Sequence, residues 1–435
     1  MSRLLILTSL AFLLYLPNTS ATLALTNLQT LLQQHPLPQT PAQNTPSHAP
    51  WSHSPHCTTS HHLAHLGQKF CIYTSNTTGP YGLSLILKPR DAVRATAHLS
   101  DNPLESFLTK RQAESMYLGG VGGGQAWKVV DVPGKDKGVV ATRRIARFET
   151  VMVDQAAVVV DMDLEKAVMK GESNAMLKLA VERLRAPGVI RDMSAKHNDG
   201  KDEEEVEGEE GRLEEDVMKT NAFGSTVVDV STRALFPLIS RINHACNPNS
   251  FVMFSRAGVS MAIKAYRDIE EGEEITISYL LLGIPSHKRT HLLSRWGFTC
   301  TCALCSLPPQ EKKASDLRRV MIAQAEEKII QLAESYDLPA AIALTHESIQ
   351  MIIEEEVYPM LTDEYAMLAM LYLEHGDRKS AEKYGKLAWG LLGDLGFLGV
   401  GEEKDRQTFT LERLLGNMGK LGGDGSGGKW KKGEV

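Results

Sequence analysis

Short apolar runs separated by turn residues fill the middle of the chain and predict β-strands. Residues 126–131 and 139–142 each have the composition of a strand, and the segment 133–138 between them contains the proline and glycines typical of a turn. These residues therefore predict a β-hairpin. The same reasoning predicts further extended segments at 149–154, 226–230, 251–254, 259–264 and 274–279.

From residue 312 onward the hydrophobic positions recur with helical spacing. Residues 315–336 and 340–355 have long amphipathic patterns. Thr362 can cap a further helix that runs to His375, and residues 380–391 return after a turn. Alanines and aromatic residues along this last pair resemble one tetratricopeptide-type hairpin. The whole chain is therefore expected to be α+β, with its helices concentrated at the C-terminal end.

Changes in residue composition and hydrophobic pattern along the chain predict its domain organisation. We expect a signal peptide at 1–24, an N-terminal extension or linker at 25–115, a strand-rich domain at 116–282, a cysteine-containing segment at 283–310, a helical domain at 311–415 and a disordered tail at 416–435. The prediction for 1–24 rests on a positive start followed by an almost wholly apolar stretch, residues 4–16. That stretch is shorter than the roughly 20 residues that span a membrane, so no membrane span is expected. The alternative to a signal peptide is that these residues form a buried amphipathic N-terminal segment of an intracellular protein.

Composition and charge are those of a soluble globular protein. Hydrophobic residues make up 43% and charged residues 23%, with a formal net charge of -6. We therefore expect no direct binding of nucleic acid. Eleven of the eighteen residues from Asp199 to Asp216 are acidic, which predicts a disordered acidic insert at about 197–216. The alternative is that this acidic run attracts the basic tail of a substrate.

Cysteine spacing indicates a metal site. Cys300, Cys302 and Cys305 place three thiols within one turn of chain, and Cys246 is the remaining cysteine in this half of the sequence. Four thiolates in a tetrahedron are a typical structural zinc site, with no open position for catalysis. Free thiols or disulfides are the alternatives.

The N-terminal cysteines suggest a different chemistry. Cys57 and Cys71 could pair if the chain enters an oxidising compartment. Asn76-Thr77-Thr78 is a glycosylation sequon, although such triplets are common by chance.

Three motifs occur in a fixed order around these cysteines. They are the run Asn243-His244-Ala245-Cys246-Asn247-Pro248-Asn249, the run Glu274–Tyr279 and the Cys300–Cys305 segment. Together they resemble the motifs of SET-domain methyltransferases, and the order is most similar to the SMYD subfamily and its fungal relatives. Ala245 stands where the family has serine, and the zinc-finger insertion of typical SMYD proteins is missing. The resemblance covers about residues 126–306, with a weaker similarity to 390.

The resemblance implies a fold, an activity and a set of residue roles. The fold is a SET domain of short, mostly antiparallel strands, whose C-terminal segment threads beneath a loop as a pseudoknot, followed by a post-SET zinc segment. The activity is S-adenosylmethionine-dependent protein lysine N-methylation, with a histone or nonhistone protein as substrate. The cofactor-binding residues implied are Lys137, Gly138, Val139, Asn243, His244, Tyr279, Trp296 and Phe298, and Tyr279 is the catalytic residue.

Two alternatives remain open from the sequence. One is a noncatalytic scaffold in which the C-terminal helices bind a peptide partner. The other is a secreted protein that keeps the zinc-stapled fold for stability. Location is open as well, because the start of the chain indicates secretion while the chemistry of the family indicates the nucleus or cytoplasm.

Overall fold

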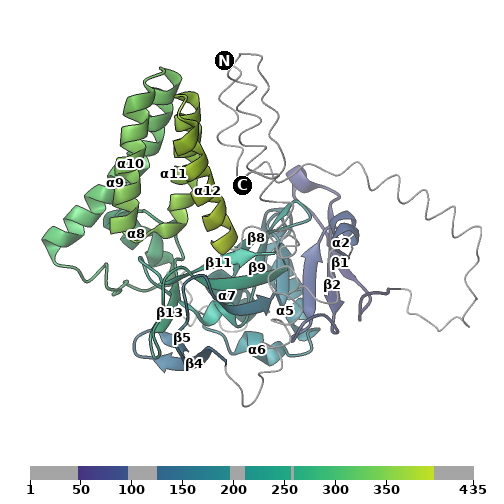
Figure 1. The fold of residues 1–435 in the computed structure, drawn as a ribbon. Helices are drawn as coiled ribbons and strands as arrows, with labels where there is room; N and C mark the ends of the chain where they lie inside the picture. Colours follow the sequence, from purple (N-terminus) through teal and green to yellow (C-terminus); the bar gives the residue numbers. More distant parts are fainter. Residues whose placement is uncertain (1–47, 97–124, 196–210, 256–258, 396–435) are drawn as a thin grey trace, which may run out of the picture. The chain divides into compact units, whose positions relative to one another are not determined.

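The computed structural model describes residues 48–96, 125–195, 211–255 and 259–395. The predicted signal peptide, the acidic residues up to 210 and the predicted tail lie outside these ranges, so those predictions stay predictions. In the described part the chain is α+β, as expected, with a helical C-terminal region (Figure 1). No helix within these ranges is both long enough and apolar enough to cross a membrane.

The largest sheet has six strands in the order β1-β2-β3-β7-β9-β8. The strands are β1 (His56–Thr59), β2 (Lys69–Ser75), β3 (Leu83–Leu87), β7 (Val158–Asp161), β9 (Val230–Leu235) and β8 (Phe223–Val227). β3 and β7 are buried along their whole length and pair in parallel. Residues 56–87 are therefore part of the same sheet as later strands, and a boundary at residue 116 does not separate two structural units.

Two smaller sheets complete the strand-rich region. One has the order β10-β13-β5-β4, and the other the order β11-β12-β6. Their strands are β4 (Trp127–Val132), β5 (Asp136–Ala141), β6 (Thr150–Gln155), β10 (Asn243–His244), β11 (Ser250–Phe254), β12 (Ser260–Ala265) and β13 (Glu274–Ile277). β4 and β5 form the hairpin that the sequence predicted. Among the described strand pairs, β3–β7 and β10–β13 are parallel and the others antiparallel, which confirms a mostly antiparallel fold. The pseudoknot stays a prediction.

A tight turn interrupts the segment 226–230, for which the sequence predicted a strand. Val228 and Asp229 have φ values of 46° and 67°, in the left-handed region, and they join β8 to β9. A valine rarely adopts this conformation, so its β propensity concealed the turn. The prediction of one strand across 226–230 is therefore wrong.

The end of the acidic run is a helix rather than a loop. α7 (Arg212–Asn221) buries Glu214 and Glu215, which are 4% and 5% exposed. Arg191 donates to Glu214 at 2.8 Å, and Arg233 donates two hydrogen bonds to Glu215 at 3.0 and 2.8 Å. Burial of a carboxylate is tolerable when a cation pairs with it. The prediction of a disordered insert is therefore wrong from residue 212 onward. The acidic run alone could not reveal the helix, because the arginines that pair with its glutamates lie elsewhere in the sequence.

Helices cover the six-stranded sheet. They are α2 (Pro89–Thr96), α4 (Leu164–Ala167), α5 (Lys170–Glu182), α6 (Pro187–Arg191) and α7, with a 3-10 turn η2 (Leu63–His65) near β1. Apolar residues of α5, among them Leu177 and Val181, pack with Ile72 of β2 and Ile86 of β3 in one core cluster. The strands β2 and β3 therefore share a hydrophobic core with later parts of the chain.

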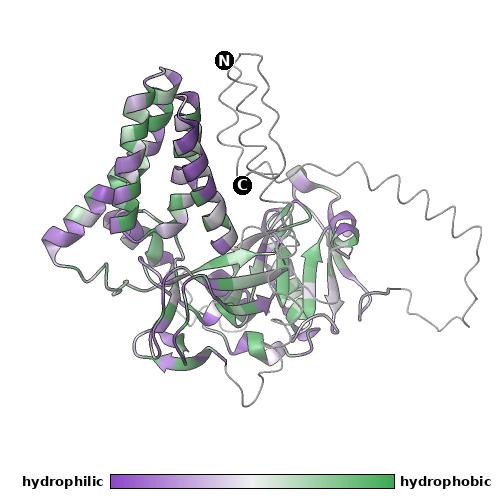
Figure 2. Ribbon diagram, viewed as in Figure 1, coloured by the Kyte–Doolittle hydropathy of each residue, from purple (hydrophilic) through white to green (hydrophobic). Residues whose placement is uncertain are grey.

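The C-terminal region consists of long helices. α9 (Pro309–Glu334), α10 (Leu338–Glu354), α11 (Leu361–Glu374) and α12 (Arg378–Leu395) follow α8 (Ser286–Leu293) and the short turns η6 (Ser294–Trp296) and η7 (Tyr358–Met360). Hydrophobic and hydrophilic residues share each of the long helices (Figure 2), and the apolar ones form a single core. The helical domain is confirmed, whereas its tetratricopeptide-type character stays a prediction.

Candidate functional site: a pocket beside four cysteines

Strand pairing brings the predicted hairpin and two of the sequence motifs together. β10 lies parallel to β13, with Asn243 opposite Thr276 and His244 opposite Ile277. β13 in turn pairs with β5, where Ile275 lies opposite Val139. The hairpin near residue 137, the Asn243 motif and the strand that leads to Tyr279 are therefore neighbours in one sheet, although more than a hundred residues separate the first from the others.

The Asn243 side chain joins two of these segments. Its Nδ2 donates to the main-chain oxygen of Lys137 and to Oε1 of Glu274, each at 2.9 Å. Gly138 leaves the space for this contact, because an added Cβ would lie 2.9 Å from Nδ2 of Asn243 and 2.5 Å from a methyl of Val132. The close packing around this position therefore explains why it holds a glycine.

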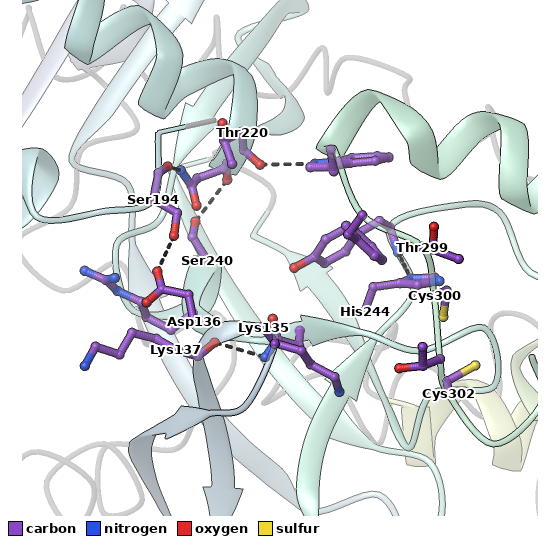
Figure 3. Close-up of a pocket in the computed structure, with 18 residues that line it drawn as sticks. Lys135, Asp136, Lys137, Ser194, Thr220, Ser240, His244, Thr299, Cys300 and Cys302 are labelled. Carbon is purple, nitrogen blue, oxygen red and sulfur yellow. Dashed lines mark hydrogen bonds between the residues drawn. The ribbon is translucent and has the colours of Figure 1, made fainter. Parts of the chain in front are cut away.

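A pocket of about 130 Å³ lies against this junction. Its lining residues are Gly134, Lys135, Asp136, Lys137, Ser194, Thr220, Asn221, Ser240, Arg241, Asn243, His244, Tyr279, Trp296, Phe298, Thr299, Cys300, Thr301 and Cys302. In Figure 3, Asp136, Lys137, Ser194 and Ser240 lie on one side of the view, and His244, Thr299, Cys300 and Cys302 lie on the other. Six of the eight residues expected at a cofactor site line the pocket. Gly138 and Val139 do not, and Val139 is buried in the core.

Aromatic rings gather around Tyr279. The centroid of its ring lies 5.2 Å from that of Trp296, 5.3 Å from that of His244 and 6.5 Å from that of Phe298. Its hydroxyl donates to the main-chain oxygen of Ile242 at 2.9 Å. Burial raises the pKa of Tyr279 well above its ordinary value, and the charge of Glu274 adds to the effect. Tyr279 is therefore a neutral hydrogen-bond donor at physiological pH.

His244 connects the aromatic cluster to the cysteines. Its Nδ1 accepts the main-chain N–H of Tyr279 at 3.0 Å, so the hydrogen of the neutral ring is on Nε2. That Nε2 lies 3.2 Å from Sγ of Cys246 and can donate to it. Burial lowers the pKa of His244 to about 4, which keeps the ring neutral at physiological pH.

Four sulfur atoms converge at one end of the pocket. Sγ of Cys246 lies 3.8 Å from that of Cys300 and 3.5 Å from that of Cys305, and the main-chain N–H of Cys246 points to Sγ of Cys302 at 3.4 Å. All four sulfurs lie within 4.8 Å of one another. A metal with four bonds of about 2.3 Å in a tetrahedron separates its sulfurs by about 3.8 Å. The four predicted ligands can therefore hold one metal ion, and no other such group occurs among the described residues.

Sequence reasoning missed one wall of the pocket. Thr220 and Asn221 end α7, and the main-chain oxygen of Thr220 accepts the indole N–H of Trp296 at 3.1 Å. Ser194 and Ser240 also line this wall. None of these residues belongs to a recognisable motif. Arg241 also lines the pocket, and here the sequence did offer a signal, because Arg241 stands two positions before Asn243.

Comparison with known proteins agrees with this geometry. A family model described as "SET domain" matches residues 136–280. The chain is 33% identical over 163 residues to Histone-lysine N-methyltransferase set5 of Schizosaccharomyces pombe, which is 37% of this chain and 50% of the relative. It is 40% identical over 84 residues to Histone-lysine N-methyltransferase SMYD3 of Homo sapiens, 19% of each chain.

A third relative gives a longer match at lower identity. N-lysine methyltransferase SMYD2 of Homo sapiens is 27% identical over 191 residues, 39% of this chain and 43% of the relative. The chain thus spans half or less of the length of the relatives that it matches. Residues 136–280 therefore match a SET domain, and the chain is similar to the set5 and SMYD lysine methyltransferases over part of its length.

Proposed function

We propose that the chain is an S-adenosylmethionine-dependent protein lysine N-methyltransferase. The observation that carries the proposal is that Lys137 of the β4–β5 hairpin, Asn243 and Tyr279, from three separate segments of the chain, line the same pocket. The SET domain and the names of its relatives support the same reaction. The substrate would be a protein that presents a lysine, whether a histone or another protein.

The lining of the pocket fits such a cofactor chemically. Its aromatic rings can contact a flat base and can attract a sulfonium cation, and main-chain groups near Lys137 and Asn243 offer hydrogen bonds. The volume of about 130 Å³ is below the roughly 300 Å³ at which pockets for drug-sized ligands usually begin. S-adenosylmethionine, which is a drug-sized molecule, would therefore occupy the open mouth of the pocket as well as its enclosed part.

The roles of the residues follow from their surroundings. S-adenosylmethionine supplies an electrophilic methyl group when it is bound. The aromatic side chains of Tyr279, Trp296 and Phe298 would exclude water and so favour an uncharged lysine, whose pKa is ordinarily about 10.4. Tyr279 would act as a rigid neutral wall with its oxygen fixed by Ile242, and would orient the amine rather than remove its proton.

We further propose that the four cysteines hold a structural zinc ion. Four thiolate ligands leave no open position, so the ion would serve as a crosslink. It would tie Cys246, two residues after His244, to the segment that follows Phe298. The Nε2–H of His244 would then donate to a metal-bound thiolate, an outer hydrogen bond of the kind that stabilises such sites.

Calorimetry on the full chain tests the proposal. We expect micromolar binding of S-adenosylmethionine, about one zinc ion per chain, and transfer of a labelled methyl group to lysines in a panel of histones and other proteins. Asn243→Ala should weaken binding about tenfold or more, because it removes the hydrogen bond to the Lys137 oxygen. Lys128→Ala, an exposed change on β4 outside the pocket lining, should not. A folded, zinc-loaded chain that binds no cofactor would reject the enzyme in favour of the noncatalytic scaffold.

A further inference from the structure

The strand β1 is crosslinked to the protein. Within the described residues β1 pairs with β2 alone, at the edge of the six-stranded sheet. Cys57 of β1 and Cys71 of β2 lie directly opposite each other in this register and form a disulfide. Cys71 is 1% exposed, so the bridge is covered on that side. Disulfides of this kind form and persist in oxidising compartments and are rare in the cytosol and nucleus.

The turn after β2 carries a second feature of the same compartments. Asn76-Thr77-Thr78 immediately follows Ser75, the last residue of β2, on the strand that contains Cys71. Asn76 is half-buried, whereas Thr77 is exposed. An Asn-x-Thr triplet in a surface turn is an acceptor for N-linked glycan.

The local contacts of Asn76 are compatible with such a modification. Its main-chain N–H donates to Oγ of Ser52 at 2.8 Å, which fixes the backbone of the turn. Its side-chain Nδ2 lies 3.3 Å from Nε2 of His53. The amide has two hydrogens, so a glycan can replace one while the other still faces His53.

We propose that Asn76 is an N-glycosylation site and that the chain matures in an oxidising secretory compartment, where Cys57 and Cys71 are joined. The disulfide and the sequon are independent observations on one strand and its turn, and neither depends on the methyltransferase proposal.

Both steps use co-reactants of such a compartment. Nδ2 of Asn76 displaces the diphosphate of a lipid-linked oligosaccharide, so the nitrogen–carbon bond forms, the sugar carbon–oxygen bond breaks and the amide loses one proton. The thiols of Cys57 and Cys71 lose two protons and two electrons to the disulfide of an oxidoreductase, which becomes a dithiol. The balance of both reactions is therefore complete without any group from the pocket.

Peptide mapping of the full chain, made in a eukaryotic host with its own residues 1–24 and no added leader, tests the proposal. Free thiols are alkylated before digestion, and an amidase in heavy-oxygen water converts each glycosylated asparagine to labelled aspartate. We expect labelled Asp at position 76 and one peptide pair linked through Cys57 and Cys71. An unmodified Asn76, or alkylated Cys57 and Cys71, would overturn the proposal.

Two neighbouring threonines provide matched variants. Thr78→Ala destroys the sequon and should abolish the label at Asn76, whereas Thr77→Ala keeps an Asn-x-Thr triplet and should retain it. Both hydroxyls contact Oγ of Ser75, at 3.2 Å from Thr77 and 2.7 Å from Thr78, so the two changes remove similar local contacts. Equal labelling in the two variants would show that the signal does not come from this sequon and would also reject the site.

Discussion

The hydroxyl of Tyr279 donates to the main-chain oxygen of Ile242, the residue immediately before Asn243. One hydrogen bond therefore fixes the aromatic wall of the pocket to the segment whose amide holds the Lys137 hairpin. A change at Tyr279 should consequently act on position and orientation as well as on chemistry.

Tyr279→Phe removes this hydrogen bond and keeps the ring. The Ile242 oxygen loses its phenol partner, which we expect to cost about 1–3 kcal/mol of unfolding free energy. Cofactor affinity should change little, because the ring itself remains, whereas the rate of methyl transfer should fall about tenfold or more. Calorimetry and single-turnover transfer measure the two effects separately. An unchanged rate would remove Tyr279 from the catalytic role.

Gly138→Ala should displace Asn243 and so disturb the lining of the pocket. The added methyl would meet the Val132 side chain at 2.5 Å and Nδ2 of Asn243 at 2.9 Å. Relief of such overpacking typically costs about 1–3 kcal/mol, and displacement of Asn243 should weaken cofactor binding about tenfold. Gly224→Ala is the control, because a Cβ there would contact nothing within 4 Å. Similar affinities in both variants would contradict the packing role of Gly138.

Removal of metal should act on stability and on the pocket together. Cys302→Ser replaces a soft ligand that also lines the pocket, and we expect loss of bound zinc, a lower midpoint of thermal unfolding and weaker cofactor binding. Cys57→Ser with Cys71→Ser changes the other cysteine pair and should retain about one zinc ion per chain. Elemental analysis of both proteins decides the point, and full zinc in Cys302→Ser would mean that the four-sulfur assignment is wrong.

Asp154 should give the protein a distinctive dependence on pH. Its buried carboxylate accepts the N–H groups of Leu238 and Ile239 at 2.7 and 3.1 Å, where η5 (Ile239–Arg241) begins. Burial raises the pKa of Asp154 to about 6, although these hydrogen bonds partly oppose the rise. The folded state therefore holds its proton more tightly than the unfolded state, for which the pKa is about 3.9.

The sign of the effect follows from this difference. The stabilising contribution of the proton is complete below about pH 4, and it is lost as the pH rises through about 6. Two pH units correspond to about 3 kcal/mol. Asp154→Asn lacks this titration, so the stability of the unchanged protein relative to the variant should fall by about 3 kcal/mol between pH 4 and 7. Denaturant unfolding of both proteins at matched pH measures it, and a constant difference would refute the titration.

Local patterns predicted much of the site because its residues are locally distinctive. The hairpin at 126–142 showed itself through alternation and turn residues, and the cysteines through their spacing. The sequence could not show that residues 56–87 would join the sheet of β7, since pairing partners leave no mark on either strand alone. Nor could it show that Arg191 and Arg233 would neutralise the acidic start of α7. Long-range pairing decided what local propensity left open.

The two sets of cysteines also differ in when they can act during synthesis. Cys57 and Cys71 are only fourteen positions apart and precede Cys246, so both leave the ribosome before the later cysteines and can close a short loop. The four-sulfur cluster needs Cys246 and Cys305, and the pocket needs residues from 134 to 302, so neither can form until these later residues have been made. A nascent chain would thus have a crosslinked first strand while its later cysteines are still being synthesised, so a metal held by the four sulfurs would bind after that crosslink can close.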